Sequence, residues 1–220
     1  MRVTLAGATG MVGGLLLERL RADAAVREIH VVGRRPPAGI GGDARLRFHQ
    51  TDFGNLSMSP PWAAADRGYC CLGTTLRAAG SEPAFRAVDH DAVLAFERAL
   101  RRGGTPEFRV ISSVGADPAA RSLYLRVKGE TEVELASFNF PRLLVFRPGL
   151  LRGSRAEFRF GEHLALATAP LWELFLQGRR SRFRTTRAVD LARALCELHS
   201  SDPIKVCENE AIRSAFDQAR

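Results

Sequence analysis

The first fourteen residues constrain the fold of this chain more than any other stretch. They begin with an apolar run at residues 3–6, which is followed by the glycine-rich sequence GATGMVGG at residues 7–14. Apolar residues then recur at helical spacing from Met11 to Leu20. A strand, a glycine turn and a helix in this order place a dinucleotide pyrophosphate at the N-terminus of the helix.

Three glycines of this turn have separate physical roles. Gly7 allows the sharp turn, Gly10 lets the backbone approach the phosphates, and Gly13 lets the helix pack close to the strand. Their spacing differs by one residue from the GxGxxG pattern. Because glycine turns also join strands to helices where no ligand binds, the motif predicts a nucleotide site only together with the features below.

Strands and helices alternate through about residue 150, which predicts a doubly wound α/β fold with a parallel sheet and helices on both faces. We expect a single domain over residues 1–220, with a nucleotide-binding core at 1–150 and a small substrate region at 151–220. The segments expected to be strands are 29–32, 46–48, 68–72, 108–111, 143–146 and 204–206; a long helix is expected from Pro83 to Gly103, and a further helix over 162–176.

The cysteines and the hydropathy pattern indicate the compartment in which the protein is expected. The chain has no apolar run long enough to span a membrane, and no secretory signal is expected at its N-terminus. Its cysteines lack the spacing of metal ligands, so we expect no metal site and a reducing, cytoplasmic setting. They are Cys70, Cys71, Cys196 and Cys207.

The net charge of +8 comes almost entirely from arginine, since Lys128 and Lys205 are the only lysines. A nucleic-acid-binding protein usually concentrates its basic residues on one face or in a tail. Here the arginines are scattered over several expected helices. This distribution favours a solvated basic surface, and we expect no nucleic-acid partner.

Charged residues follow the second and third expected strands. Arg34 and Arg35 lie about 20 residues beyond the glycine turn, where an acid binds the ribose of NAD and an arginine accommodates the 2′-phosphate of NADP. Two arginines and no acid favour NADP(H) over NAD(H), because a guanidinium pairs bidentately with phosphate. The alternative is an exposed basic turn. Asp52 could reach an adenine amino group or cap the next turn.

Tyr124 and Lys128 are four residues apart and share one face of an expected helix. A lysine ammonium beside a tyrosine favours the phenolate, as does an oxidised nicotinamide. Ser113 ends the fifth expected strand and could hold a substrate carbonyl while Tyr124 transfers a proton. A tyrosine and a lysine at this spacing are usually structural, but their position after a strand ending in Ser112 and Ser113 favours catalysis.

Together these segments resemble the short-chain dehydrogenase/reductase superfamily, and within it the atypical branch that includes the Tat-interacting protein. The resemblance implies a Rossmann fold and a nicotinamide cofactor. It is carried by GATGMVGG at 7–14, CLGTTLRAAGS at 71–81, ISSVGADP at 111–118, YLRVKGETE at 124–132, FRPGLLRG at 146–153 and ENEAI at 208–212.

The resemblance also implies roles for single residues. The catalytic set would be Ser113, Tyr124 and Lys128, although the spacing leaves the choice between Ser112 and Ser113 open. The cofactor contacts would be Gly7, Thr9, Gly10, Met11 and Val12 at the pyrophosphate, Arg34 and Arg35 at the 2′-phosphate, Asp52 at the adenine, Leu72, Gly73 and Thr74 at the ribose, and Pro148, Gly149 and Leu151 beside the nicotinamide. Tyr124 and Lys128 of the catalytic set would also contact the cofactor.

We therefore expect an NADP(H)-dependent reductase or dehydrogenase that acts on a small carbonyl compound or alcohol, as a monomer or homodimer. One alternative is an enzyme similar to nucleotide-sugar epimerases or dehydratases, although the short region after residue 150 disfavours a large substrate. Another is a regulator that senses NADP(H) without turnover.

Overall fold

The computed structural model describes residues 1–56, 60–153 and 183–217, and its centre is a seven-stranded sheet in the order β3-β2-β1-β4-β5-β6-β9. Every neighbouring pair in this sheet is parallel. The chain winds outward from β1 in both directions, so the predicted doubly wound fold is confirmed. The strands are β1 (Arg2–Ala6), β2 (Glu28–Gly33), β3 (Leu46–Gln50), β4 (Arg67–Cys70), β5 (Phe108–Ile111), β6 (Leu143–Arg147) and β9 (Ile204–Glu208).

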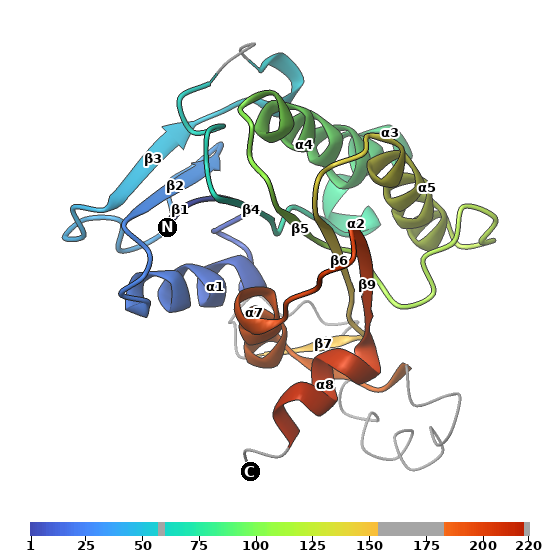
Figure 1. The fold of residues 1–220 in the computed structure, drawn as a ribbon. Helices are drawn as coiled ribbons and strands as arrows, with labels where there is room; N and C mark the ends of the chain where they lie inside the picture. The colour runs from blue at the N-terminus through green and yellow to red at the C-terminus, as the bar shows by residue number, and fades with distance from the viewer. Residues whose placement is uncertain (57–59, 154–182, 218–220) are drawn as a thin grey trace.

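Helices cover both faces of the sheet, as Figure 1 shows. One face carries α1 (Met11–Ala22), α7 (Ala188–Glu197) and α8 (Asn209–Asp217). The other carries α3 (Glu82–Arg86), α4 (Ala92–Arg102) and α5 (Leu123–Ser137). The remaining elements are α2 (Leu76–Ala79), the short helical turns η1 (Phe53–Asn55) and η2 (Ala87–Asp91), and the strand pair β7 (Leu151–Arg152) and β8 (Thr186–Arg187).

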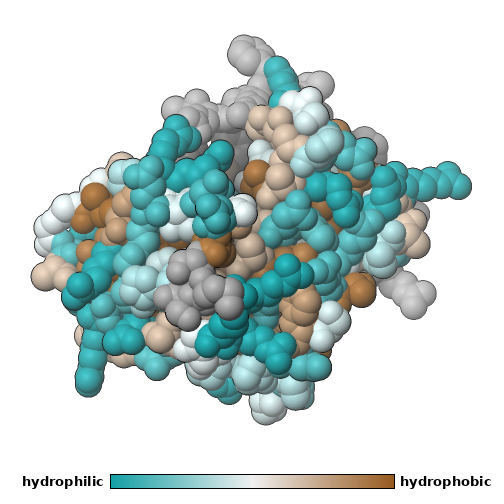
Figure 2. Space-filling view, turned by 90° about the horizontal axis from the view of Figure 1, so that it is seen from above, coloured by the Kyte–Doolittle hydropathy of each residue, from teal (hydrophilic) through white to brown (hydrophobic). Residues whose placement is uncertain are grey.

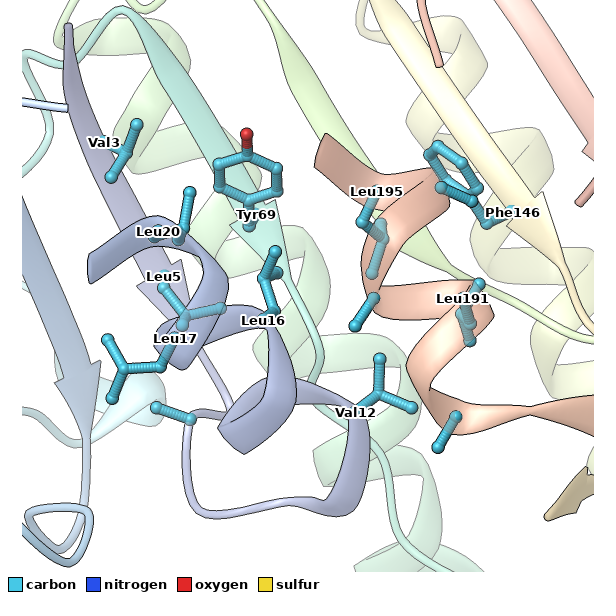
Figure 3. Packing of buried hydrophobic residues seen from close by; sticks show 14 of the residues in the cluster. Val3, Leu5, Val12, Leu16, Leu17, Leu20, Tyr69, Phe146, Leu191 and Leu195 are labelled. Atoms are coloured by element: carbon cyan, nitrogen blue, oxygen red, sulfur yellow. The ribbon is translucent and has the colours of Figure 1, made fainter. Parts of the chain in front are cut away.

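Two apolar cores hold these helices on the sheet. On one face Leu16 of α1 and Leu191 of α7 pack against β1, β4 and β6 (Figure 3). On the other face Phe96 of α4 packs on Phe108 of β5. Each such side chain contributes roughly 1.5–3 kcal/mol when it is fully buried. Because the strands are parallel, all their carboxyl ends lie at one edge of this packed sheet.

The helix expected from Pro83 differs from a regular α-helix. It begins at Glu82, where the Ser81 hydroxyl accepts a hydrogen bond from the Ala84 N–H at 3.3 Å. Residues Ala87–Asp91 then form a π-helical turn before α4 begins. Such turns insert an extra residue and often mark functional sites.

Two further expectations concern other parts of the chain. The helix expected over residues 162–176 lies outside the described residues. None of the described helices is both long and apolar enough to cross a membrane.

Candidate functional site

The glycine turn packs against the end of β4. Gly7 has a positive φ of 85°, and a Cβ there would lie 2.4 Å from the Cys71 carbonyl oxygen. A Cβ on Gly13 would lie 2.1 Å from the Gly7 oxygen. Neither position has room for a side chain, so α1 starts directly at the end of the first strand, as the motif predicts.

A cavity of about 550 Å³ opens at the carboxyl ends of β1, β2 and β4. Its volume lies in the range of cofactor-binding sites. It brings together many of the predicted cofactor residues, namely Gly7, Thr9, Gly10, Arg34, Arg35, Asp52, Leu72 and Gly73. It is also lined by residues that the sequence did not single out, among them Phe53, Val88 and Asp91.

The start of α1 suits an anion. Its first residues, Met11–Gly14, include no acid, and the N-cap residue Gly10 makes no side-chain cap. A Cβ on Gly10 would point to within 3.2 Å of the Gly7 oxygen, so glycine keeps the backbone open at this point. Backbone N–H groups and the positive end of the helix dipole favour a phosphate here.

The charged residues around this cavity are exposed. Arg34 and Arg35 lie at the end of β2, where they can reach a ligand. Asp52 accepts a hydrogen bond from the Gly54 N–H at 3.0 Å and so caps η1, while it also lines the cavity. The two roles considered for Asp52 are therefore compatible with each other.

Other predicted cofactor residues lie outside the lining of the cavity. Val12 is 5% exposed and packs in the core, so only its backbone N–H is available to a ligand. Met11 and Leu151 pack partly against the same core. Pro148 and Gly149 are buried after β6, where the Gly149 N–H donates to Thr186 Oγ1 at 2.9 Å.

Lys128 is buried in α5, and its Nζ lies 2.9 Å from Asp89 Oδ1. Burial is the largest single effect and lowers the pKa of Lys128, but the Asp89 carboxylate, with smaller contributions from Tyr124 and Cys70, acts in the opposite direction, so the pKa of Lys128 is raised and its side chain is an ammonium. Thr74, a predicted ribose contact, donates its backbone N–H to Asp89 Oδ2 at 2.7 Å. One carboxylate therefore joins the lysine to the loop after β4.

Tyr124 lies on the same helix as this lysine, and Ser113 follows strand β5. Tyr124 precedes Lys128 by one helical turn, is 38% exposed, and places its ring 5.9 Å from that of Phe85. Ser113 is half-buried at the end of β5. The loop that follows it packs on α5, because the Asp117 N–H donates to the Leu125 oxygen at 3.2 Å.

Ser112 has a different environment from Ser113. It is 5% exposed, and its hydroxyl donates to Glu132 of α5 in a short hydrogen bond. Arg147, at the end of β6, binds Glu132 Oε2 at 2.5 Å and Glu208 at 2.9 Å. Ser112 is thus held in a network that joins β5, α5, β6 and β9, whereas the Ser113 hydroxyl donates one long hydrogen bond, to the Val114 oxygen at 3.3 Å.

Sequence reasoning missed Asp89. The apolar residues Phe85, Ala92 and Phe96 form the buried stripe of the expected helix, and Asp89 lies on the same stripe, four residues after Phe85. An acid at a core-facing helical position is the signal that could have identified it.

Comparisons with known sequences identify relatives over most of the chain. No protein-family model matches it. Protein HTATIP2 of Rattus norvegicus is 36% identical over 174 residues, which cover 74% of this chain and 68% of that protein. Protein FMP52, mitochondrial, of Coccidioides immitis is 34% identical over 169 residues, which cover 72% of this chain and 69% of that protein.

Solved structures show the same fold at lower sequence identity. MoeE5 in complex with UDP-glucose and NAD has a TM-score of 0.70 and 16% identity, with 100% of this chain and 82% of that chain covered. The PhqB reductase domain of Penicillium fellutanum has a TM-score of 0.68 and 18% identity, with 93% of this chain and 66% of that chain covered. At these identities the likeness shows the fold alone.

The cytoplasmic setting expected from the cysteines is wrong. Several fungal relatives are named as mitochondrial proteins. The four cysteines are free in the structure. Free thiols indicate only that oxidation is absent, and they do not distinguish one reducing compartment from another.

Proposed function

This chain belongs to the atypical branch of the short-chain dehydrogenase/reductase superfamily, with the HTATIP2 and FMP52 proteins that it matches, and we propose that it is an NADP(H)-dependent oxidoreductase. We propose a small carbonyl compound or alcohol as its substrate. The observation that carries this proposal is the position of Gly73, which lines the cavity and whose Cβ would lie 3.9 Å from Lys128 Nζ. The cavity and the lysine of the predicted catalytic set therefore meet at one strand end.

The cavity residues fit a phosphorylated dinucleotide. The start of α1 would hold the pyrophosphate, and Arg34 and Arg35 would pair with the 2′-phosphate that distinguishes NADP from NAD. When bound, the nicotinamide supplies or accepts the hydride.

Side chains of this protein would bind the substrate oxygen and transfer its proton. In the direction of reduction, Tyr124 donates its hydroxyl proton to the carbonyl oxygen, and in oxidation it takes a proton from the alcohol. Ser113 donates a hydrogen bond to the same oxygen. Lys128 is an ammonium with three N–H donors, and its Nζ lies 2.9 Å from Asp89 Oδ1 in an ion pair.

We propose that the chain works as one domain, in which residues 151–220 complete the substrate side of the core. Support comes from the hydrogen bonds around Thr186. Its hydroxyl accepts from the Gly149 N–H at 2.9 Å and donates to Asn209 Oδ1 at 2.5 Å, while Asn209 donates to the Arg184 oxygen at 2.7 Å. The ENEAI segment thus anchors the chain beside the predicted nicotinamide residues.

A panel of small aldehydes and ketones tests the proposed chemistry through the oxidation of NADPH. With a substrate of the wild-type protein, Tyr124→Phe is expected to lower kcat by about 10²–10⁴-fold without changing the Kd for NADPH, because it removes only the transferable proton. Tyr69→Phe is the matched control, since Tyr69 is the only other tyrosine and lies outside the cavity lining. Normal turnover by Tyr124→Phe contradicts the assigned role.

The second candidate is a regulator that binds NADP(H) without turnover. The 38% exposure of Tyr124 favours it, because an open phenol is poorly shielded for proton transfer unless a substrate covers it. Binding of NADPH without oxidation across the whole panel supports this candidate. An epimerase-like or dehydratase-like reaction is distinguished by conversion of a nucleotide sugar with no net consumption of NADPH.

A further inference from the structure

Asp89 is a buried carboxylate that joins three parts of the candidate site. It is 1% exposed, and it lies in the π-helical turn η2. One of its oxygens lies 2.9 Å from Lys128 Nζ, and the other accepts the Thr74 N–H at 2.7 Å. Its backbone oxygen also accepts a hydrogen bond from Thr131 Oγ1 at 3.2 Å. The loop after β4, η2 and α5 therefore meet at this one residue.

Stability alone explains this ion pair poorly. Both side chains are almost fully buried, at 1% and 6% exposure, so each loses most of its hydration. Buried pairs of this kind are often no more stable than apolar residues of the same volume, whereas loss of one partner is strongly destabilising. A functional reason for the pair is therefore worth seeking at the site itself.

Lys128 carries a buried charge that needs a partner of opposite sign, and Asp89 Oδ1 is 2.9 Å from its Nζ. The groups that act most on the pKa of Lys128 besides burial are Asp89, Tyr124 on its own helix, and Cys70 of β4. Glu132 lines the same small cavity as Lys128 but binds Ser112 and Arg147. Burial raises the pKa of Cys70 to about 12, so this thiol is neutral at physiological pH. Asp89 is therefore the carboxylate that offsets the cost of burying the ammonium.

The π-helical turn gives Asp89 its position. Val88 and Asp91, on either side of it, line the cavity. Asp89 itself points inward to Lys128 and the Thr74 N–H. A single turn thus contributes to the cavity wall and holds the lysine behind it, which fits the frequent occurrence of π-helical turns at functional sites.

We propose that Asp89 is a positioning residue for this site, which keeps Lys128 charged while buried and fixes it to the loop of Leu72, Gly73 and Thr74. The role in cofactor binding rests on the proposed function, whereas the effect on Lys128 does not. Asp89→Asn is the informative variant, because its amide oxygen can still accept the Thr74 N–H while the charge is removed.

The test is a pH titration of the ligand-free protein labelled with ¹³C at the lysine Cε and followed by NMR. The chain has only two lysines, and Lys205, which is half-exposed and lies 4.0 Å from Asp202, serves as the reference signal. In Asp89→Asn the pKa of Lys128 is expected to fall relative to wild type, because burial is no longer opposed by a carboxylate, while the Lys205 signal is unchanged. Identical Lys128 titrations in the two proteins overturn the proposal.

A second measurement compares the affinity of wild type and Asp89→Asn for NADPH. Asp89→Asn is expected to bind NADPH about 10- to 100-fold more weakly, as for loss of a charge-assisted hydrogen bond. If wild type itself binds no NADPH, the proposed function fails while the lysine titration still decides the role of Asp89.

A third measurement applies if Asp89→Asn does not fold. Lys128→Met alone leaves the Asp89 carboxylate buried without a partner, so the double variant Asp89→Asn with Lys128→Met is expected to have a higher Tm than Lys128→Met. A lower Tm of the double variant overturns the proposal.

Discussion

Two buried acids on the helical stretch 82–102 have opposite environments. Asp89 is paired with Lys128 at 2.9 Å. Glu97 of α4 is 0% exposed, and neither of its carboxylate oxygens has a hydrogen-bond partner among the described residues. Burial raises the pKa of Glu97 to about 7, although Arg101 and Arg98 act in the opposite direction. The buried acid is therefore protonated below about pH 7 and becomes an unpaired carboxylate above it.

Glu97→Gln is expected to change how stability depends on pH. The ordinary pKa of 4.5 rises to about 7 on folding, so the folded state binds more protons and the free energy of unfolding falls as pH rises from 4.5 to 7. The loss reaches at most about 3 kcal/mol. Thermal unfolding from pH 5 to 8 should show a higher Tm for Glu97→Gln than for wild type at pH 8.

The control for this prediction is Glu18→Gln, which changes a glutamate whose side chain is 69% exposed. Its Tm profile should follow that of wild type. Parallel profiles for wild type and Glu97→Gln would mean that Glu97 is not the titrating group.

At the level of the elements, Ser112 belongs to a network with Glu132, Arg147 and Glu208, and Ser113 does not. We therefore expect a structural role for Ser112 and a catalytic role for Ser113. Ser112→Ala is expected to lower the free energy of unfolding by about 1–2 kcal/mol and to retain turnover, because it removes a buried hydrogen bond to Glu132. Ser113→Ala should leave stability nearly unchanged and lower kcat by about 10²–10³-fold, because it removes a donor to the substrate oxygen. Urea unfolding and steady-state kinetics measure both, and the reverse pattern would assign catalysis to Ser112.

The elements were largely predictable because their signals are local. The strands of the core sheet fall within one or two residues of the apolar runs that predicted them. The π-helical turn was not predicted, because it has no local signal as strong as an apolar run. The inward position of Asp89 could have been inferred from the apolar stripe of its helix, but its partner Lys128 lies far away in the sequence. The glycine turn is a local motif and was predicted, whereas the pair of Asp89 and Lys128 joins distant residues and was not predicted.

Across the whole molecule, arginines are found both on the surface and in the interior. Arg34 and Arg35 are exposed, and hydrophilic side chains of all kinds cover most of the face seen in Figure 2. Some arginines are internal instead: Arg109 is 0% exposed, and Glu107 contacts Arg67, Arg109 and Arg142 at 2.6, 2.6 and 2.9 Å. The expectation of a solvated basic surface is therefore incomplete, because a buried acid also gathers arginines around itself.

We propose that the cavity at the strand ends binds a phosphorylated dinucleotide. Titration calorimetry of the wild-type protein with NADPH and with NADH measures this binding. We expect NADPH to bind more tightly than NADH, and the double variant Arg34→Ala with Arg35→Ala to lose this preference while its Kd for NADH is retained. Absence of heat with either dinucleotide, or an unchanged preference in the double variant, would contradict this proposal.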